Sequence, residues 1–229
     1  MNWLTGFRWD DGRRRVVGSL LLAQFCFVAF VKWRTGAVEQ LLWVSHAGLL
    51  LSAFGLLSGR LRWAATALIM VLLPHAVWVG DWMFTLFLPG RLFGVTEYLQ
   101  QAGIWDELAT LHHFFLAPAL LCCVPIETRR SGFSLLGATA AFFVLTCMAH
   151  AVSGPSSNIN YAFYIPDTLS GTSATVLNNI DRRWYLLALN ACACACCFLP
   201  AWGLLRVVDR MIASNLGSDR AEGQTLGRA

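Results

Sequence analysis

Residues 61–80 read LRWAATALIMVLLPHAVWVG, and this stretch decides the fold class of the chain. Arg62 and His75 are the only ionisable side chains among its 20 residues. An α-helix rises about 1.5 Å per residue, so about 20 mostly apolar residues are enough to cross the hydrocarbon core of a bilayer. The stretch therefore predicts a transmembrane helix.

Apolar runs of similar length lie on both sides of this stretch. The chain as a whole is 57% apolar and only 13% charged, whereas soluble domains are about 45–50% apolar. We therefore expect an all-α fold, a polytopic membrane protein built as a bundle of about six transmembrane helices. The five further runs are residues 16–31, 38–57, 107–124, 133–152 and 184–205.

Small residues are spaced one helical turn apart in the second run. They form the patterns Gly48-xxx-Ser52 and Gly55-xxx-Gly59. Small residues at this spacing let a neighbouring membrane helix approach closely. We therefore expect the run 38–57 to pack tightly within the bundle.

Basic residues are distributed unevenly between the two ends of the predicted bundle. One end carries twelve Lys and Arg and the other five, and cytoplasmic loops carry the excess of these residues. We predict a multi-pass protein of a bacterial cytoplasmic (inner) membrane with both termini in the cytoplasm. The long loops 81–106 and 153–183 then face outward. The predicted divisions are a cytoplasmic segment 1–15, a transmembrane domain 16–208 and a cytoplasmic, disordered tail 209–229.

The positions of the eight cysteines argue against a disulfide-rich protein, and the small net charge argues against a nucleic-acid-binding protein. The cysteines all fall inside apolar runs, where a thiol behaves as a small hydrophobic group, so we expect packing residues and no disulfide framework. The net charge is +4, and no basic run interleaved with aromatic residues suggests a nucleic-acid partner. The cysteines are Cys26, Cys122, Cys123, Cys147, Cys192, Cys194, Cys196 and Cys197.

Polar residues of several runs converge at the predicted outer face of the membrane. An ionisable group within a span costs on the order of 3 kcal/mol on insertion scales, so each one is a candidate functional residue. His75 lies in the last two turns of the third run and Asp81 is expected to end that helix, while His46 lies near the middle of the second run. The other members of this set are His112, His113, His150, Asn158 and Asn160.

We assign candidate roles within this polar set. Asp81 is predicted as the acid/base or orienting carboxylate and His113 as its partner. Because adjacent helical residues point about 100° apart, only one of His112 and His113 is expected to line the interior. The alternatives are that Asp81 lies in the aqueous interface and that the histidines are satisfied helix-end residues. The predicted substrate-binding residues are Asn158, Asn160, His75 and His150.

Three chemistries are compatible with these residues. The first is acid–base or nucleophilic catalysis, the second is a metal site of His and Asp with an open position, and the third is haem ligation by two histidines. The chain contains no HExxH motif or comparable local signature. We therefore assign no metal ligand from the sequence and leave the cofactor open.

Five short segments carry a likeness to known proteins: residues 42–46, 73–81, 94–98, 111–118 and 158–161. Together they resemble an uncharacterised group of bacterial integral membrane proteins with six helices. This resemblance covers most of residues 35–205 and implies a six-helix unit in which Asp81, His113, Asn158 and Asn160 are the shared polar residues.

A fainter likeness, in Asn160-Tyr161 and residues 184–187, is to the YwaF-like membrane proteins. These are related to an acyltransferase that uses a Cys and a His, and the present chain has no Cys in the outer half of its third run.

The leading functional hypothesis is a membrane-embedded enzyme that acts on a lipid or lipid-linked substrate at the outer leaflet. The alternative is a non-catalytic membrane subunit of a larger complex, one that bears a cofactor or pigment. The expected partners are membrane lipids and, in the alternative, other membrane protein subunits. A transporter is less favoured, because no run shows the paired Gly/Pro interruption typical of discontinuous helices.

Overall fold

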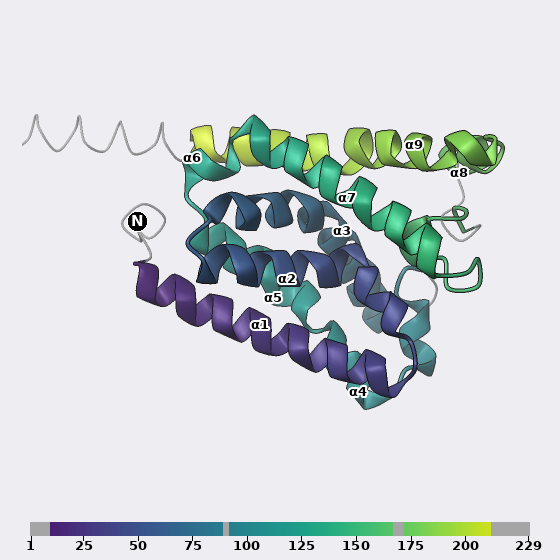
Figure 1. Cartoon of the computed structure of the whole chain (residues 1–229), viewed down its shortest axis with the longest axis horizontal. Helices are drawn as coiled ribbons and strands as arrows, with labels where there is room; N and C mark the ends of the chain where they lie inside the picture. The colour runs from purple at the N-terminus through teal and green to yellow at the C-terminus, as the bar shows by residue number, and fades with distance from the viewer. Residues whose placement is uncertain (1–9, 89–91, 167–171, 212–229) are drawn as a thin grey trace, which may run out of the picture.

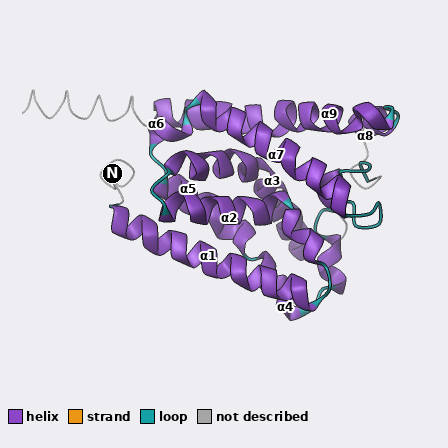
Figure 2. Ribbon diagram, in the orientation of Figure 1, coloured by secondary structure: helices purple, strands orange, loops and turns teal. Residues whose placement is uncertain are grey.

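The computed structural model describes residues 10–88, 92–166 and 172–211, and the described residues form helices without any strand (Figures 1 and 2). The predicted all-α fold is therefore confirmed. In chain order the elements are α1 (Asp11–Arg34), η1 (Val38–Leu42), α2 (Val44–Leu57), α3 (Leu61–Phe87), η2 (Glu97–Gln101), α4 (Ile104–Thr110), α5 (His112–Cys123), α6 (Ile126–Arg129), α7 (Gly132–Val152), η3 (Ile159–Tyr161), α8 (Thr172–Asn178), α9 (Arg182–Ala193) and the π-helical turn η5 (Cys194–Phe198).

Four helices in the described part of the chain are long and apolar enough to cross a membrane. They are α1, α3, α7 and the helix Arg182–Met211, which contains α9 and η5. The run predicted at 38–57 is divided at Trp43 into η1 and α2, and the run predicted at 107–124 is divided at Leu111 into α4 and α5. The prediction of helices suited to a membrane is thus confirmed for these four, and the predicted count of six transmembrane helices stays a prediction.

Three predicted boundaries differ from the structure. The helix α3 continues to Phe87, so Asp81 lies within the helix and does not end it. The first helix begins at Asp11, where the Asp10 side chain accepts a hydrogen bond from the Arg13 amide, so the predicted N-terminal segment 1–15 is partly helical. The last helix reaches Met211, beyond the predicted end of the membrane domain at 208; residues 1–9 and 212–229 lie outside the described residues.

The helix α3 lies at the centre of the fold, between α2, α5 and α7 (Figure 1). All residues from Ala64 to Val71 are buried, so apolar contacts surround this part of the helix on every side. The helix α2 approaches α3 closely at two glycines: a Cβ atom on Gly55 would lie 2.6 Å from the Ala64 backbone nitrogen, and one on Gly48 would overlap the Val71 side chain. This close approach confirms the tight packing predicted from the small residues.

A buried ion pair joins the short helix α6 to the last helix, and it also contacts the C-terminal part of α5. The Arg129 guanidinium donates two hydrogen bonds to the Asp209 carboxylate, at 2.8 and 3.1 Å, and a third to the Leu121 carbonyl at 2.9 Å. Arg130 adds a second cation 3.6 Å from the same carboxylate. Because Asp209 is almost completely buried, this pair belongs to the folded core and not to a polar tail.

The α2–α3 contact predicts a strong effect for a small substitution. Gly55→Ala should lower the free energy of unfolding by about 1–3 kcal/mol, because the new methyl group meets backbone that cannot move aside. Gly203→Ala is the matched control: its Cβ would meet nothing within 4 Å, and removing a helical glycine is neutral or adds up to about 1 kcal/mol. Thermal unfolding of both variants in detergent measures the difference, and equal midpoints would contradict the proposed close packing.

Candidate metal centre

An interruption of the helix at Leu111 separates α4 from α5. The backbone hydrogen bonds change there from four-residue to three-residue spacing: the Leu111 amide donates to the Leu108 carbonyl at 3.4 Å, and the Phe114 amide donates to the Leu111 carbonyl at 3.0 Å. This change makes the carbonyl groups of Ala109 and Thr110 available to side chains.

Two histidines bind the carbonyls at this interruption. The Nδ1 atoms of His112 and His113 lie 2.8 Å from the carbonyl oxygens of Ala109 and Thr110, respectively. A carbonyl oxygen only accepts hydrogen bonds, so each Nδ1 carries the hydrogen and each Nε2 has a free lone pair. Gln24 of α1 completes the arrangement by donating from Nε2 to the Ala109 carbonyl at 3.3 Å.

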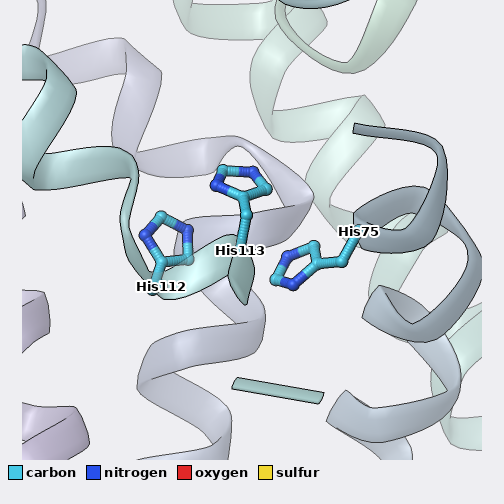
Figure 3. A group of neighbouring side chains, drawn as sticks. All are labelled: His75, His112 and His113. Carbon is cyan, nitrogen blue, oxygen red and sulfur yellow. The ribbon is translucent and has the colours of Figure 1, made fainter. Parts of the chain in front are cut away.

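His75 of α3 completes a cluster of three buried imidazoles (Figure 3). One ligand atom from each of His75, His112 and His113 lies within 4.8 Å of the others. The ring centroids of His75 and His113 are 4.5 Å apart, and those of His112 and His113 are 4.3 Å apart. The interruption of the fourth run and the central helix α3 therefore bring these three side chains to one point.

Three ring nitrogens of this cluster have no hydrogen-bond partner among the described residues. Both nitrogens of His75 and the Nε2 atom of His112 are buried and make no hydrogen bond within the described part of the chain. A buried polar atom without a partner destabilises a fold by about 1–3 kcal/mol. Such an atom in a native protein calls for a specific explanation, of which an ion site is one.

His46 of α2 lies beside the cluster and supplies a fourth imidazole. Its ring centroid is 5.3 Å from that of His112, and its Nδ1 lies 2.8 Å from the Gln40 carbonyl oxygen. The candidate set derived from the sequence did not include His46, because it was placed near the middle of a span and away from the outer face. The signal that identifies it is the rarity of an ionisable group within a span.

Asn160 holds the segment that positions His46. Its side-chain oxygen accepts a hydrogen bond from the Val44 amide at 2.8 Å, and its amide group donates to the Leu42 carbonyl at 2.7 Å. These bonds join the turn after α7 to the junction between η1 and α2. Asn160 therefore stabilises the N-terminus of the helix that carries His46.

Asn158 makes a similar set of hydrogen bonds within its own loop. Its side-chain oxygen accepts from the amides of Phe163 and Tyr164, and its amide group donates to the Tyr164 carbonyl at 2.9 Å. Both Asn158 and Asn160 have a positive φ, which Asn tolerates better than most residues. Their predicted role in substrate binding stays a prediction, and their visible role is to shape the loop.

Asp81 faces the loop after α3. Its carboxylate accepts four hydrogen bonds: from the amides of Phe93 (2.7 Å) and Gly94 (3.0 Å), and from the amide (2.9 Å) and hydroxyl (2.7 Å) of Thr96. Asp81 is fully buried. Its acceptor positions are therefore used to fold the loop and are not directed at His113, and its predicted catalytic role stays a prediction.

An aromatic contact links this loop to the histidines. The Trp78 indole stacks on the His113 ring, with centroids 4.3 Å apart and an angle of 18° between the planes. Its Nε1–H donates to the Tyr98 hydroxyl at 3.2 Å. Burial raises the pKa of Tyr98 to about 12, with the nearby Asp106 acting in the same direction, so the phenol stays neutral at physiological pH.

The positions of the histidines bear on two further sequence predictions. The expectation that only one of His112 and His113 lines the interior is wrong: both are buried, because the helix is interrupted directly before them. His150 is exposed, stacks on Phe163 with centroids 4.6 Å apart, and lies apart from the cluster, so its role in substrate binding stays a prediction.

Three imidazoles this close together could hold a metal ion. No family model, curated protein or solved structure matches this chain, so the side chains themselves carry the inference. Imidazole is a common ligand of zinc, copper, iron and nickel. A metal-ligating histidine usually donates its other ring N–H to a carbonyl or carboxylate, as His112 and His113 do here.

The hydrogen bonds of Asp81 predict a structural effect for its amide analogue. Asp81→Asn should lower the free energy of unfolding by about 1–3 kcal/mol, because an amide group would face backbone donors. Hydrogen exchange at Phe93, Gly94 and Thr96 should accelerate. Thr96→Val, which removes only the hydroxyl bond, serves as the milder control with a loss of about 1 kcal/mol. Unchanged exchange in the loop of Asp81→Asn would show that these bonds do not hold it.

The unpartnered nitrogens of His75 predict a gain in stability when the ring is replaced. His75→Leu should raise the free energy of unfolding of the metal-free protein by about 1–3 kcal/mol, since it removes buried polar atoms that lack partners. Unfolding in detergent with a chelator present measures this change. His46→Leu is the control, because His46 loses a hydrogen bond to Gln40 and should be destabilised. A destabilised His75→Leu protein would indicate that the ring has partners of its own.

Proposed function

We propose that this protein is a membrane-embedded metalloprotein that binds one transition metal ion through His75, His112 and His113. The observation that carries the proposal is the buried cluster of three imidazoles, with ligand atoms within 4.8 Å of one another. Support comes from the hydrogen bonds at the Nδ1 atoms of His112 and His113, which set the tautomer that leaves Nε2 free for a metal.

The same site suits catalysis. Three protein ligands leave one coordination position open, as in catalytic metal sites, where the ion polarises a substrate or activates water. We propose a lipid or lipid-linked molecule at the outer leaflet as the substrate. In this proposal His75 and His113 are ligands, while Asp81, Asn158 and Asn160 maintain the surrounding structure. A non-catalytic subunit that stores or passes on the metal is the alternative.

We further propose that the bundle crosses a bacterial inner membrane six times, with both termini in the cytoplasm. Besides the four long helices, the units η1–α2 and α4–α5 each extend over about six turns and would form the other two crossings. Non-helical backbone is tolerated at membrane depth only where the protein satisfies its polar groups. Asn160 does so at the first interruption, and Gln24 with the histidines does so at the second.

Cobalt(II) is a direct probe of the proposed site. The full chain, purified in detergent and stripped with a chelator, should bind one equivalent of Co(II) with visible absorption bands. His75→Leu, His112→Ala and His113→Ala should each weaken binding by at least about 100-fold, since even the loss of an outer hydrogen-bond partner costs about 10–100-fold.

His150→Ala is the matched control, because it removes an exposed histidine outside the cluster and should leave Co(II) binding unchanged. Gel filtration establishes that each variant is folded, and His75→Leu is the variant expected to fold best. Elemental analysis of protein purified without chelator identifies the metal acquired in the cell. Failure of the wild-type protein to bind Co(II), Zn(II), copper or Fe(II) would refute the proposal.

A further inference from the structure

The donors of the histidine cluster carry no negative charge. Within the described residues, the group that brings ligand atoms together consists of His75, His112 and His113, with no Asp, Glu or Cys among them. The nearest carboxylate along α3, that of Asp81, is occupied by four hydrogen bonds from the loop 93–96. The proposed ligands themselves would therefore bring no negative charge to a bound cation.

Two groups near the cluster add no net charge to it. The Lys32 ammonium group of α1 lies 2.8 Å from the Asp106 carboxylate of α4, so these two charges offset each other. On the other side His113 is covered by the Trp78 indole, which is neutral.

Burial makes the charge of the ion decisive. His46, His75, His112 and His113 are each at most 7% exposed, so an ion among them is largely removed from water. The electrostatic penalty of burying an ion rises with the square of its charge, so a divalent ion costs about four times as much as a univalent ion of equal size. Neutral ligands at a buried site therefore favour the lower charge.

Among the metals that bind imidazole, copper is the one with a stable univalent form. Cu(I) forms complexes with only two or three ligands. Zn(II) in proteins usually has four ligands, one of which can be a water molecule. Three imidazoles meet the requirement of Cu(I) without any anion. His46, with its centroid 5.3 Å from that of His112, provides a fourth imidazole next to the site.

We infer that the histidine cluster selects Cu(I), because it is buried, is built from neutral imidazoles and lacks a carboxylate or thiolate ligand. This inference rests on the proposed metal site and specifies its ion. It places the protein among those that handle cuprous copper within the bilayer. The electrostatic selection acts against the preference of nitrogen ligands for Cu(II).

The comparison that tests the inference is between Cu(I) and Cu(II) on the same protein. Cu(II) binds nitrogen ligands more tightly than the other divalent ions of its row, so it is the strictest competitor. The full chain in detergent is titrated with Cu(I) under anaerobic conditions with ascorbate and a cuprous chelator, and separately with Cu(II) against a cupric chelator. The expected result is one Cu(I) per chain, bound at least about 100-fold more tightly than Cu(II).

A matched pair of variants tests whether charge is the cause. His46→Asp places a carboxylate beside the site, and His46→Asn places a neutral group of the same shape there. The preference for Cu(I) over Cu(II) should fall by at least about tenfold in His46→Asp relative to His46→Asn, because the carboxylate offsets the second positive charge. An equal preference in both variants would show that ligand geometry, and not charge, selects the ion.

The outcomes separate the two proposals. If Cu(II) or Zn(II) binds as tightly as Cu(I) and depends on His75, His112 and His113, the inference about Cu(I) is wrong while the metal site stands. If no metal ion binds, or if binding is unchanged in His75→Leu, both proposals fall. Tight Cu(I) binding that depends on all three histidines and is insensitive to His150→Ala supports both.

Discussion

The requirement that every buried backbone group find a partner governs the interior of this protein. Within an apolar bundle no water is available to donate a hydrogen bond to a carbonyl that an interrupted helix leaves without its amide partner. A side chain must therefore donate that hydrogen bond. At Leu111 the imidazoles of His112 and His113 bind the released carbonyls of Ala109 and Thr110. One nitrogen of each ring is thereby fixed as a donor and the other as an acceptor. The same hydrogen bonds that permit the interruption leave the Nε2 atoms available for the proposed metal ion.

The packing around α3 explains why the third imidazole is held firmly. α3 is buried along its first half, and Gly48 and Gly55 bring α2 so close that small shifts of either helix would create overlaps. His75 therefore reaches the cluster from a rigid element, while Trp78, one turn further on, covers His113. Asp81 follows on the same helix and organises the loop that carries Tyr98. Three consecutive turns of one helix thus supply the proposed ligand His75, the indole that covers His113 and the carboxylate that holds the overlying loop.

The residues of the proposed metal site lower the stability of the metal-free protein. Unpartnered nitrogens of His75 and His112 destabilise the metal-free fold, and a core of leucines would satisfy packing equally well. The tight helix contacts, the Arg129–Asp209 pair and the loop hydrogen bonds of Asn158 and Asn160 offset that cost elsewhere. Structural polar residues and the proposed ligands therefore differ in their partners: Asp81 and Asn160 are hydrogen-bonded at both ends or at every oxygen, whereas the ring nitrogens of His75 have no hydrogen-bond partner among the described residues.

The sequence by itself determined that the protein is helical and suited to a membrane, because stretches such as 61–80 are too long and too apolar for another environment. It also identified most of the costly polar residues, since an ionisable group in a span is rare for physical reasons. Only the tertiary structure decided what each of them does. No Gly or Pro marks the interruption at Leu111 in the sequence. This interruption is nevertheless what allows both His112 and His113 to be buried. The carbonyl partners of His112 and His113 are local, but the packing of α2 and α3 against α5 places His46 and His75 beside them, whereas His150 lies apart against Phe163.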